Sequence, residues 1–403
     1  MKPLSTALGF ALFLVSHSSL LGQTALVIID ASQFKTLQAA IDALPDTGGM
    51  VKLPAGTFEI TQPLLITTPE TRIEGAGAST HIKNVNESGE PALMLRPPHR
   101  ADDPKERLWR LQLGNFRLSG NEKSGDGVRA EGIQEIFIHG LSVDHHGGNG
   151  IALIDCYEDP RVSDSIITYN KAAGLYIQAC HDIVVNGNHF EEDWDAVKCV
   201  DSFNLCMNGN NIDDHLGNGV VIENTYGSVV SGNMIEECNG TAIVLDRDCY
   251  GITLSANVIA HELEGGIDLR DAHGCAVSAN TFTLVHRFSV RLGPDSGRIN
   301  ISGNSFGNSE VGGGTLIRKL EHENPMQIDM GTGVLIEGAS HVNVSGNTFS
   351  GLHLGAVKAT GDIRGVLVTG NVITDWNRSQ TAGVEAISIP ASDKNRVGDN
   401  LID

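Results

Sequence analysis

Basic residues are scarce in this sequence. Its 403 residues include 28 Lys and Arg against 49 Asp and Glu, which gives a formal net charge of −21. Nucleic acids and anionic membrane surfaces are bound through basic patches, so neither is an expected partner. Aromatic residues make up only 5% of the chain, whereas there are 47 Gly. This balance favours many short strands and tight turns over helices.

Cysteine gives no sign of a zinc site. There are seven cysteines, so at least one has no disulfide partner within the chain, and neither C-x-x-C nor H-x-x-x-H spacing occurs. We therefore expect no structural zinc. Most of the cysteines should be small core residues, with room for one disulfide bridge.

Long apolar runs are missing after residue 15. Residues 7–15 (ALGFALFLV) follow Lys2 and precede small polar residues, a pattern typical of a secretory signal peptide. The run is too short to span a bilayer. The sequence thus predicts a signal peptide over 1–23, a secreted or periplasmic protein, and one domain over 24–403 without a membrane span.

What the sequence has in abundance is an internal repeat. A small residue precedes an apolar-x-apolar segment in steps of 22 to 24 residues, with one longer step of 44. These small residues are Gly127, Gly150, Gly174, Ala196, Gly219, Ala242, Gly266, Ser289, Gly333 and Ala356. An Asn recurs later in each repeat, at Asn188, Asn210, Asn233, Asn257, Asn280, Asn304, Asn347 and Asn371. A unit this short cannot bury its apolar face alone, so successive units must stack as the coils of a solenoid.

The repeat predicts an all-β parallel β-helix with about 23 residues per coil and regular coils over about 110–403. Stacked coils lie ~4.8 Å apart, so equivalent residues form ladders. The recurring Asn suits an internal ladder in which side-chain amides bond to one another. The step of 44 contains an insertion at 307–327, which is either part of a binding face or a tolerated surface loop.

The segment before the repeats predicts a cap. Residues 33–44 carry a helical pattern of apolar residues, and a helix within a capping segment at 31–60 would cover the open end of the solenoid. The stretch TLQAAIDALPDTGGMVKLPAGTFEI, with the following IEGAG, resembles the N-terminal signature of the pectate-lyase superfamily of right-handed parallel β-helices. The resemblance implies the fold but no single activity. That superfamily includes polysaccharide lyases, glycoside hydrolases, epimerases, phage tailspikes and adhesins.

Charged residues gather on one outward face of the predicted coils. Side chains alternate along a strand, so the second and fourth residues after each small residue face outward. Glu223, Asp246 and Arg270 share the fourth position in successive coils, and the like-charge neighbours should raise one carboxyl pKa. Asp268 and Arg291 share the second position and are expected to pair.

These carboxylates are the candidate catalytic residues of a glycosidase. Asp246 or Glu223 would be the proton donor, Asp268 the base or nucleophile, and His261, in the preceding turn, a proton carrier. Asp268 would lie about 8 Å diagonally from Asp246. Glycosidases use carboxyl separations of ~5 Å for retention and ~8 Å for inversion. Both are available here, so the stereochemistry stays open.

Further residues near this face are candidates for substrate binding. Cationic side chains would hold substrate oxygens or carboxylates, aromatic ones would stack on a sugar ring, and turn histidines would contact its hydroxyls. The candidates are Lys198, Arg270 and Arg291; Tyr176 and Trp194; and His215 and His286. The acidic turns at 213–214 and 236–237 could hold Ca²⁺, but the sequence contains no calcium-loop motif, so no cofactor is certain.

Three functions remain open. A hydrolase acting on a polysaccharide or oligosaccharide is slightly favoured, although the polygalacturonase motifs are not intact in the corresponding strands, WDAVKC, NGVVIE and SVRLG. A lyase or epimerase on a uronic-acid polymer would draw its base and its charge neutralisation from the basic and aromatic candidates, but the epimerase D-P-H motif is absent. A non-catalytic adhesin would not need Glu223 beside Asp246.

Overall fold

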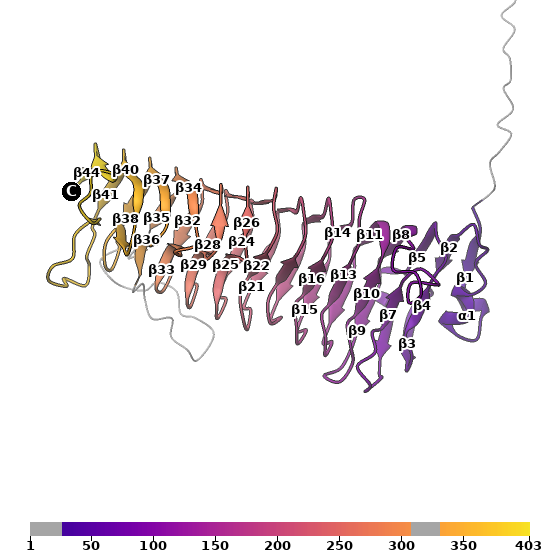
Figure 1. The fold of residues 1–403 in the computed structure, drawn as a ribbon. Helices are drawn as coiled ribbons and strands as arrows, with labels where there is room; N and C mark the ends of the chain where they lie inside the picture. The colour runs from indigo at the N-terminus through magenta and orange to yellow at the C-terminus, as the bar shows by residue number, and fades with distance from the viewer. Residues whose placement is uncertain (1–25, 308–330) are drawn as a thin grey trace, which may run out of the picture.

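The structure, a computed structural model, describes residues 26–307 and 331–403. Its strands stack along one axis as an elongated solenoid, coloured from indigo at the first coil to yellow at the last (Figure 1). The coils build three parallel sheets, here called A, B and C, which the chain visits in the order C, A, B. The parallel β-helix is thereby confirmed. The expected signal peptide, and the insertion beyond Gly307, lie outside the described residues.

Sheet C, which carries the candidate site, has 13 strands in the described residues. They are β4 Leu64–Ile66, β7 Leu93–Leu95, β10 Val128–Glu131, β13 Ile151–Ile154, β16 Leu175–Gln178, β19 Val197–Val200, β22 Val220–Glu223, β25 Thr241–Asp246, β29 Gly265–Leu269, β33 Phe288–Leu292, β36 Thr332–Glu337, β39 Val357–Thr360 and β42 Ile387–Ser388.

In the part of the chain that the structure describes, sheet A has 17 strands and sheet B has 14. Those of sheet A are β1 Ile28–Asp30, β2 Gly49–Lys52, β5 Thr71–Glu74, β8 Leu108–Gly114, β11 Ile133–His139, β14 Arg161–Ser163, β17 Val184–Asn186, β20 Cys206–Asn208, β23 Val229–Ser231, β26 Cys249–Tyr250, β27 Thr253–Ser255, β30 Ala272–His273, β31 Ala276–Ser278, β34 Gly297–Ser302, β37 Ser340–Ser345, β40 Arg364–Thr369 and β43 Arg396–Gly398. Those of sheet B are β3 Gly56–Ile60, β6 Thr80–Asn84, β9 Arg117–Ser119, β12 Ser142–Asp144, β15 Ile166–Thr168, β18 His189–Glu191, β21 Asn211–Asp213, β24 Met234–Glu236, β28 Val258–Ala260, β32 Thr281–Thr283, β35 Ser305–Gly307, β38 Thr348–Ser350, β41 Val372–Thr374 and β44 Leu401–Ile402.

Neighbouring coils align at the predicted positions. In sheet C, Val197 pairs with Val220, Val220 with Ile243, and Ile243 with Ile267. All four side chains are fully buried. The recurring small residue at or just before the start of each strand is therefore a correct marker of the register, because the side-chain period of two fixes which residues can enter the core.

The internal asparagine ladder is also confirmed. Asn233 Nδ2 donates to Asn257 Oδ1 over 2.9 Å, and Asn257 Nδ2 donates to Asn280 Oδ1 over 3.0 Å. The backbone N–H of each donor residue bonds to the same oxygen. The ladder runs through Asn188, Asn210, Asn233, Asn257, Asn280, Asn304, Asn347, Asn371 and Asn400.

A short helix lies at the N-terminal end of the solenoid, as α1 shows in Figure 1. It spans Leu37–Ile41, and Thr36 caps it by accepting a hydrogen bond from the backbone N–H of Ala39. The predicted helix at 33–44 is too long. Residues 31–33 form the 3₁₀ turn η1 (Ala31–Gln33) instead, and Phe34 follows that turn half exposed.

The cysteines behave as core residues. All seven are free and six are buried, so the disulfide for which the sequence left room does not form. Within the described part of the chain, no helix has the length and apolarity that crossing a membrane would take.

Candidate functional site

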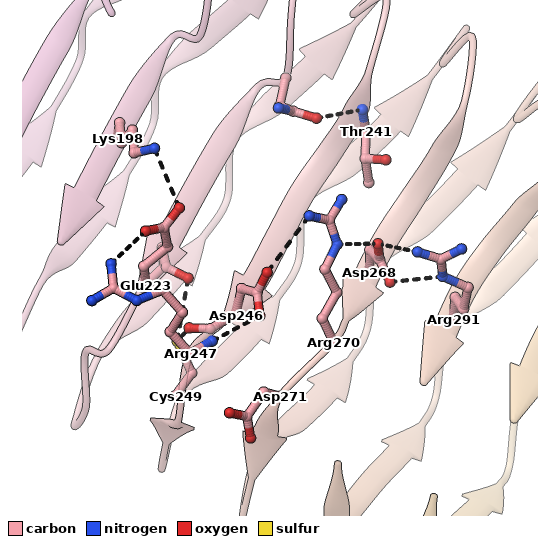
Figure 2. A network of polar contacts seen from close by, with 12 residues as sticks. Lys198, Glu223, Thr241, Asp246, Arg247, Cys249, Asp268, Arg270, Asp271 and Arg291 are labelled. Carbon is pink, nitrogen blue, oxygen red and sulfur yellow. Dashed lines mark hydrogen bonds and ion pairs between the residues drawn. The ribbon is translucent and has the colours of Figure 1, made fainter. Parts of the chain in front are cut away.

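An ion-pair network crosses the outer face of sheet C over successive coils (Figure 2). It joins strands β19, β22, β25, β29 and β33 and the residues that directly follow two of them. Its members are Lys198, Glu223, Asp246, Arg247, Asp268, Arg270 and Arg291. The predicted charged face therefore exists, and each carboxylate in it contacts at least one cation.

Asp268 is the centre of one half of this network. Its side chain is only 1% exposed although it points away from the core. Arg291 donates from Nε to Oδ1 over 2.9 Å and from Nη2 to Oδ2 over 2.6 Å, and Arg270 Nε donates to Oδ2 over 2.7 Å. The expected pairing of Asp268 with Arg291 is confirmed. These hydrogen bonds with Asp268 raise the pKa of Arg291 above its ordinary value, so the guanidinium stays charged.

Glu223 is the centre of the other half. It pairs in register with Asp246, as predicted. Burial alone would raise the pKa of Glu223, but hydrogen bonds from Arg247 and Lys198 outweigh burial and lower that pKa. The distances are 2.9 Å from Arg247 Nη1 to Oε2 and 3.2 Å from Lys198 Nζ to Oε1. The expectation of a raised pKa is therefore wrong for Glu223, because two cations compensate its like-charged neighbour.

Arg247 is the residue that sequence reasoning missed. It directly follows Asp246, and its backbone N–H donates to Asp246 Oδ1 over 2.8 Å. Its side chain turns back to Glu223 and also lies 3.6 Å from Asp201. The outward positions predicted from the sequence extend only to the fourth residue after each small residue, so Arg247, at the fifth position, was not included. Its signal was its place one step after a carboxylate, in the turn where the chain leaves the sheet.

A pocket of about 410 Å³ opens at the Asp268 end of the network. Three arginines line it, namely Arg270, Arg287 and Arg291, together with the carboxylates Asp268, Glu264 and Glu337 and the ring of Phe288. Arg287 is paired with Glu264 over 2.8 Å. Arg291 lies over the Phe288 ring, with its guanidinium carbon 5.0 Å from the ring centroid. The side chains of Arg270 and Arg291 are 46% and 34% exposed, so parts of both guanidiniums face solvent.

Trp194 and Tyr176 lie on the same side of the molecule at earlier coils. A ladder of backbone hydrogen bonds connects Trp194, Gly217, Gly240, Glu264 and Arg287, one coil apart. The indole of Trp194 is 56% exposed, and the two glycines after it put no side chain on the surface. Tyr176 is half-buried beside Lys198. Stacking of either ring on a sugar stays a prediction.

The three predicted histidines do not share one ladder. His215 is fully buried, and burial lowers its pKa to about 4, so the prediction that it contacts substrate is wrong. His261 lies one position earlier in its coil and is nearly buried, with Nδ1 3.2 Å from Glu237 and 3.6 Å from Glu236. These contacts turn it toward the acidic turn rather than toward Asp268. His286, one position later in its coil, is half-buried beside Arg287.

Two of the sets of neighbouring metal-ligand atoms in the described residues belong to the acidic turn between sheets B and C. Asp213, Asp214 and Glu237 offer oxygens that all lie within 4.8 Å of one another, and Glu236, Glu237 and His261 form a second such set. Burial, with the neighbouring Asp214 charge, raises the pKa of Asp213 to about 6. A carboxylate group able to hold a metal ion is therefore present.

Two family profiles match the sequence. One is described as "Right handed beta helix region" and covers residues 126–282, and the other is described as "Periplasmic copper-binding protein (NosD)" and covers residues 215–403. No curated protein matches the sequence significantly.

Solved structures match at low identity. The A-module of mannuronan C-5 epimerase AlgE4 from Azotobacter vinelandii is 15% identical, with a TM-score of 0.55 over 92% of this chain and 99% of that one. Pre-mature gene product 12 of bacteriophage phi29 is 12% identical, with a TM-score of 0.68 over 89% of this chain and 53% of that one. ORF18 of Geobacillus virus E2 is 16% identical, with a TM-score of 0.52. That match covers 70% of this chain and spans 57% of the viral one.

The candidate donor sets lack the thiolate ligands that select Cu(I), one form of the metal in the second profile's name. In the described residues from 215 onward there are two complete candidate groups. One is Glu236, Glu237 and His261, and the other is Asp248, Asp271 and His273. Glu237 is also the third member of the carboxylate group with Asp213 and Asp214. Each group has at most one imidazole and is otherwise made of carboxylates, and nitrogen and oxygen ligands of this kind are those that Cu(II) accepts. The stacked coils, their register and the first profile agree that the fold is a right-handed parallel β-helix, as the resemblance to the pectate-lyase superfamily implies.

Proposed function

We propose that this protein recognises an acidic polysaccharide on the outer face of sheet C and acts on it as a carbohydrate-active enzyme. The proposal is carried by the pocket in which the buried Asp268 fixes Arg270 and Arg291; Arg287, which also lines the pocket, is paired with Glu264. A guanidinium has five N–H donors in a rigid fork, and those that Asp268 does not use suit the carboxylate of a uronic acid.

A lyase or an epimerase is better served by this geometry than a hydrolase. A glycosidase needs one protonated acid and one available carboxylate. Both oxygens of Asp268 accept hydrogen bonds from arginines, and the pKa of Glu223 is lowered, so neither is suited to the role first considered for it. Lyases and epimerases of uronates remove the proton next to a carboxylate. Fixed arginines stabilise the negative charge that develops in that step.

The comparisons supply precedent at the level of the fold. A structure named as a mannuronan C-5 epimerase shares this architecture, at an identity that speaks for the fold alone. The periplasmic family name, with the signal peptide expected over 1–23, supports an exported location. If a metal accompanies the substrate, the all-carboxylate group of Asp213, Asp214 and Glu237 suits Ca²⁺. The arginine pocket does not depend on it.

A polysaccharide panel tests the proposal. The purified protein is incubated with alginate, with polygalacturonate and with neutral hydroxyethylcellulose. New reducing ends, the ultraviolet absorbance of unsaturated products and the uronate composition by NMR are then measured. A lyase gives both ends and absorbance, an epimerase changes the composition without new ends, and a hydrolase gives ends without absorbance. If a uronate polymer binds but no product is detected, the protein recognises the polymer without acting on it.

Two matched variants locate the site. Arg291→Gln should weaken binding of the uronate polymer by about tenfold, the loss of one charge-assisted bidentate contact. Arg247→Gln removes a cation of the same network that does not line the pocket, and it should leave binding nearly unchanged. If no uronate polymer binds, or if the two variants behave alike, the arginine pocket is not the recognition site.

A further inference from the structure

A row of ring-bearing side chains follows the solenoid axis where the chain passes from sheet C into sheet A. Each of six successive coils contributes one, immediately after a small, mostly buried residue. The row is Tyr157, His181, Phe203, Tyr226, Tyr250 and His273, here called the aromatic row. The rings of Phe203 and Tyr226 meet edge to face with centroids 4.4 Å apart, and His181 lies 5.8 Å from Phe203. The row is therefore a continuous feature of the fold.

The second half of the row is open to solvent. Tyr226 is 44% exposed and Tyr250 is 55% exposed. The turn residue after each ring lies in the left-handed region, and it changes from Asp182 and Asn204 in the earlier coils to glycine beside Tyr226 and Tyr250. A glycine has no side chain that could cover the neighbouring ring.

Packing alone does not account for this exposure. The chain has only five tyrosines, and three of them lie on this row. A stack that served stability would bury its rings, because the gain from an aromatic side chain scales with the area removed from water. An exposed apolar strip with polar edges is a feature of binding surfaces.

The surroundings of the row restrict its ligand. Carboxylates flank it at Asp182, Asp201, Asp248 and Asp271, of which Asp248 is exposed and the other three are partly exposed. The neighbouring cation Arg247 is already paired with Asp201 and Glu223, so the remaining carboxylates disfavour a polyanion, including a nucleic acid, whose bases also stack on rings. Hydroxyl groups, by contrast, donate hydrogen bonds to carboxylates. The rings repeat at the inter-coil spacing of ~4.8 Å along a straight line, so the matching ligand is extended and repetitive.

We propose that the aromatic row is a second carbohydrate site, which binds an extended neutral polysaccharide along the solenoid axis through Tyr226 and Tyr250. Pyranose rings have an apolar face of C–H groups that stacks on an aromatic ring, and hydroxyls at their edge that reach the flanking carboxylates. The site follows the carboxyl ends of the sheet C strands, whereas the residues that line the arginine pocket, apart from Arg270, lie within those strands or precede them. It does not depend on the function proposed for the pocket.

Affinity electrophoresis tests this site. The whole protein is run through gels containing laminarin, hydroxyethylcellulose or galactomannan, with polygalacturonate as the acidic comparison. At least one neutral polymer should retard it. The double variant Tyr226→Ala/Tyr250→Ala should lose at least about tenfold in affinity for that polymer, which corresponds to about 1.4 kcal/mol. The double variant Tyr226→Phe/Tyr250→Phe keeps the rings and should retain most of the affinity.

The controls separate this site from the rest of the surface. Tyr169→Ala removes an exposed tyrosine from a different turn and should leave the retardation unchanged. Arg291→Gln should also leave it unchanged, so a failure of the arginine pocket is distinguishable from a failure of the row. If the double alanine variant does not fold, Tyr250→Ala alone is used, since that ring is mostly exposed. Absence of retardation by all three neutral polymers, or equal retardation of the alanine variants, overturns the proposal.

Discussion

Replacing Asp268 by Asn changes one buried charge at the centre of the candidate site and little else. The amide has nearly the shape of the carboxylate, but one of its two acceptor oxygens becomes an N–H donor facing a guanidinium. Of the three hydrogen bonds from Arg270 and Arg291, at most those to a single oxygen survive.

The expected loss of stability follows from the burial of the two partners. Removing one member of a fully buried ion pair costs about 3 to 5 kcal/mol, because the remaining charge is left without compensation. Here the arginine side chains are 46% and 34% exposed, so water replaces part of the lost interaction. We therefore expect Asp268→Asn to lower the free energy of unfolding by about 2 kcal/mol. Affinity for a uronate polymer should fall by about tenfold, because the guanidiniums lose their fixed positions.

Urea unfolding and polymer binding, measured on the same preparations, check both numbers. Asp295→Asn, at an exposed carboxylate on the turn after Arg291, is the matched control and should change neither quantity. If Asp268→Asn binds the polymer as tightly as the native protein while losing stability, Asp268 supports the coil and does not organise the pocket. If it loses neither, the account of the ion-pair network is wrong.

Three further predictions concern the core. Asn257→Leu removes an amide that donates two hydrogen bonds and accepts two, and should cost about 4 kcal/mol in urea unfolding, whereas the exposed Asn239→Leu should cost little. Burial raises the pKa of Glu262 well above its ordinary value, so the folded protein keeps this carboxyl protonated while the unfolded chain loses the proton as pH rises. The free energy of unfolding of the native protein should therefore fall as pH rises, and Glu262→Gln should become more stable relative to the native protein over the same pH range. Burial lowers the pKa of His215 from 6.5 to about 4, so as pH falls the unfolded chain takes up a proton before the folded protein does. The free energy of unfolding should therefore drop by about 3 kcal/mol between pH 6.5 and pH 4. Calorimetry should find this drop reduced in His215→Gln.

The fold was predictable because the same pattern of apolar residues, small residues and Asn repeats in the sequence of each coil. The recurring small residue at the start of the sheet C strands predicted their register, and the recurring Asn, such as Asn257, predicted the position of the turn between sheets A and B. The bounds of α1 were not predictable to the residue. That helix occurs once, and a turn of 3₁₀ helix competes for the residues just before it.

The candidate site was predictable in its location and less so in its electrostatics. Strand alternation placed Glu223 beside Asp246 and Asp268 beside Arg291 correctly. It could not show that Arg247 folds back from the turn onto Glu223, because side-chain direction in a turn depends on backbone angles that the repeat does not encode. The same limit explains His215. A shift of one residue along a turn decides whether a side chain is buried, as in His215, or faces outward.

The two turns beside sheet B differ in how they satisfy buried polar groups. An asparagine ladder is self-complementary, since every amide offers the donor and the acceptor that its neighbour needs. The equivalent inward positions of the other turn hold unlike residues: His146, Asn170, Asp193, His215, Cys238 and Glu262. Unlike neighbours cannot match throughout. His146 Nδ1, Asp193 Oδ2, His215 Nε2 and both oxygens of Glu262 are buried with no hydrogen-bond partner among the described residues. Each such atom costs about 1 to 3 kcal/mol. The later of these coils also carry the acidic turn and much of the ion-pair network, so part of the candidate surface rests on the less satisfied of the two ladders.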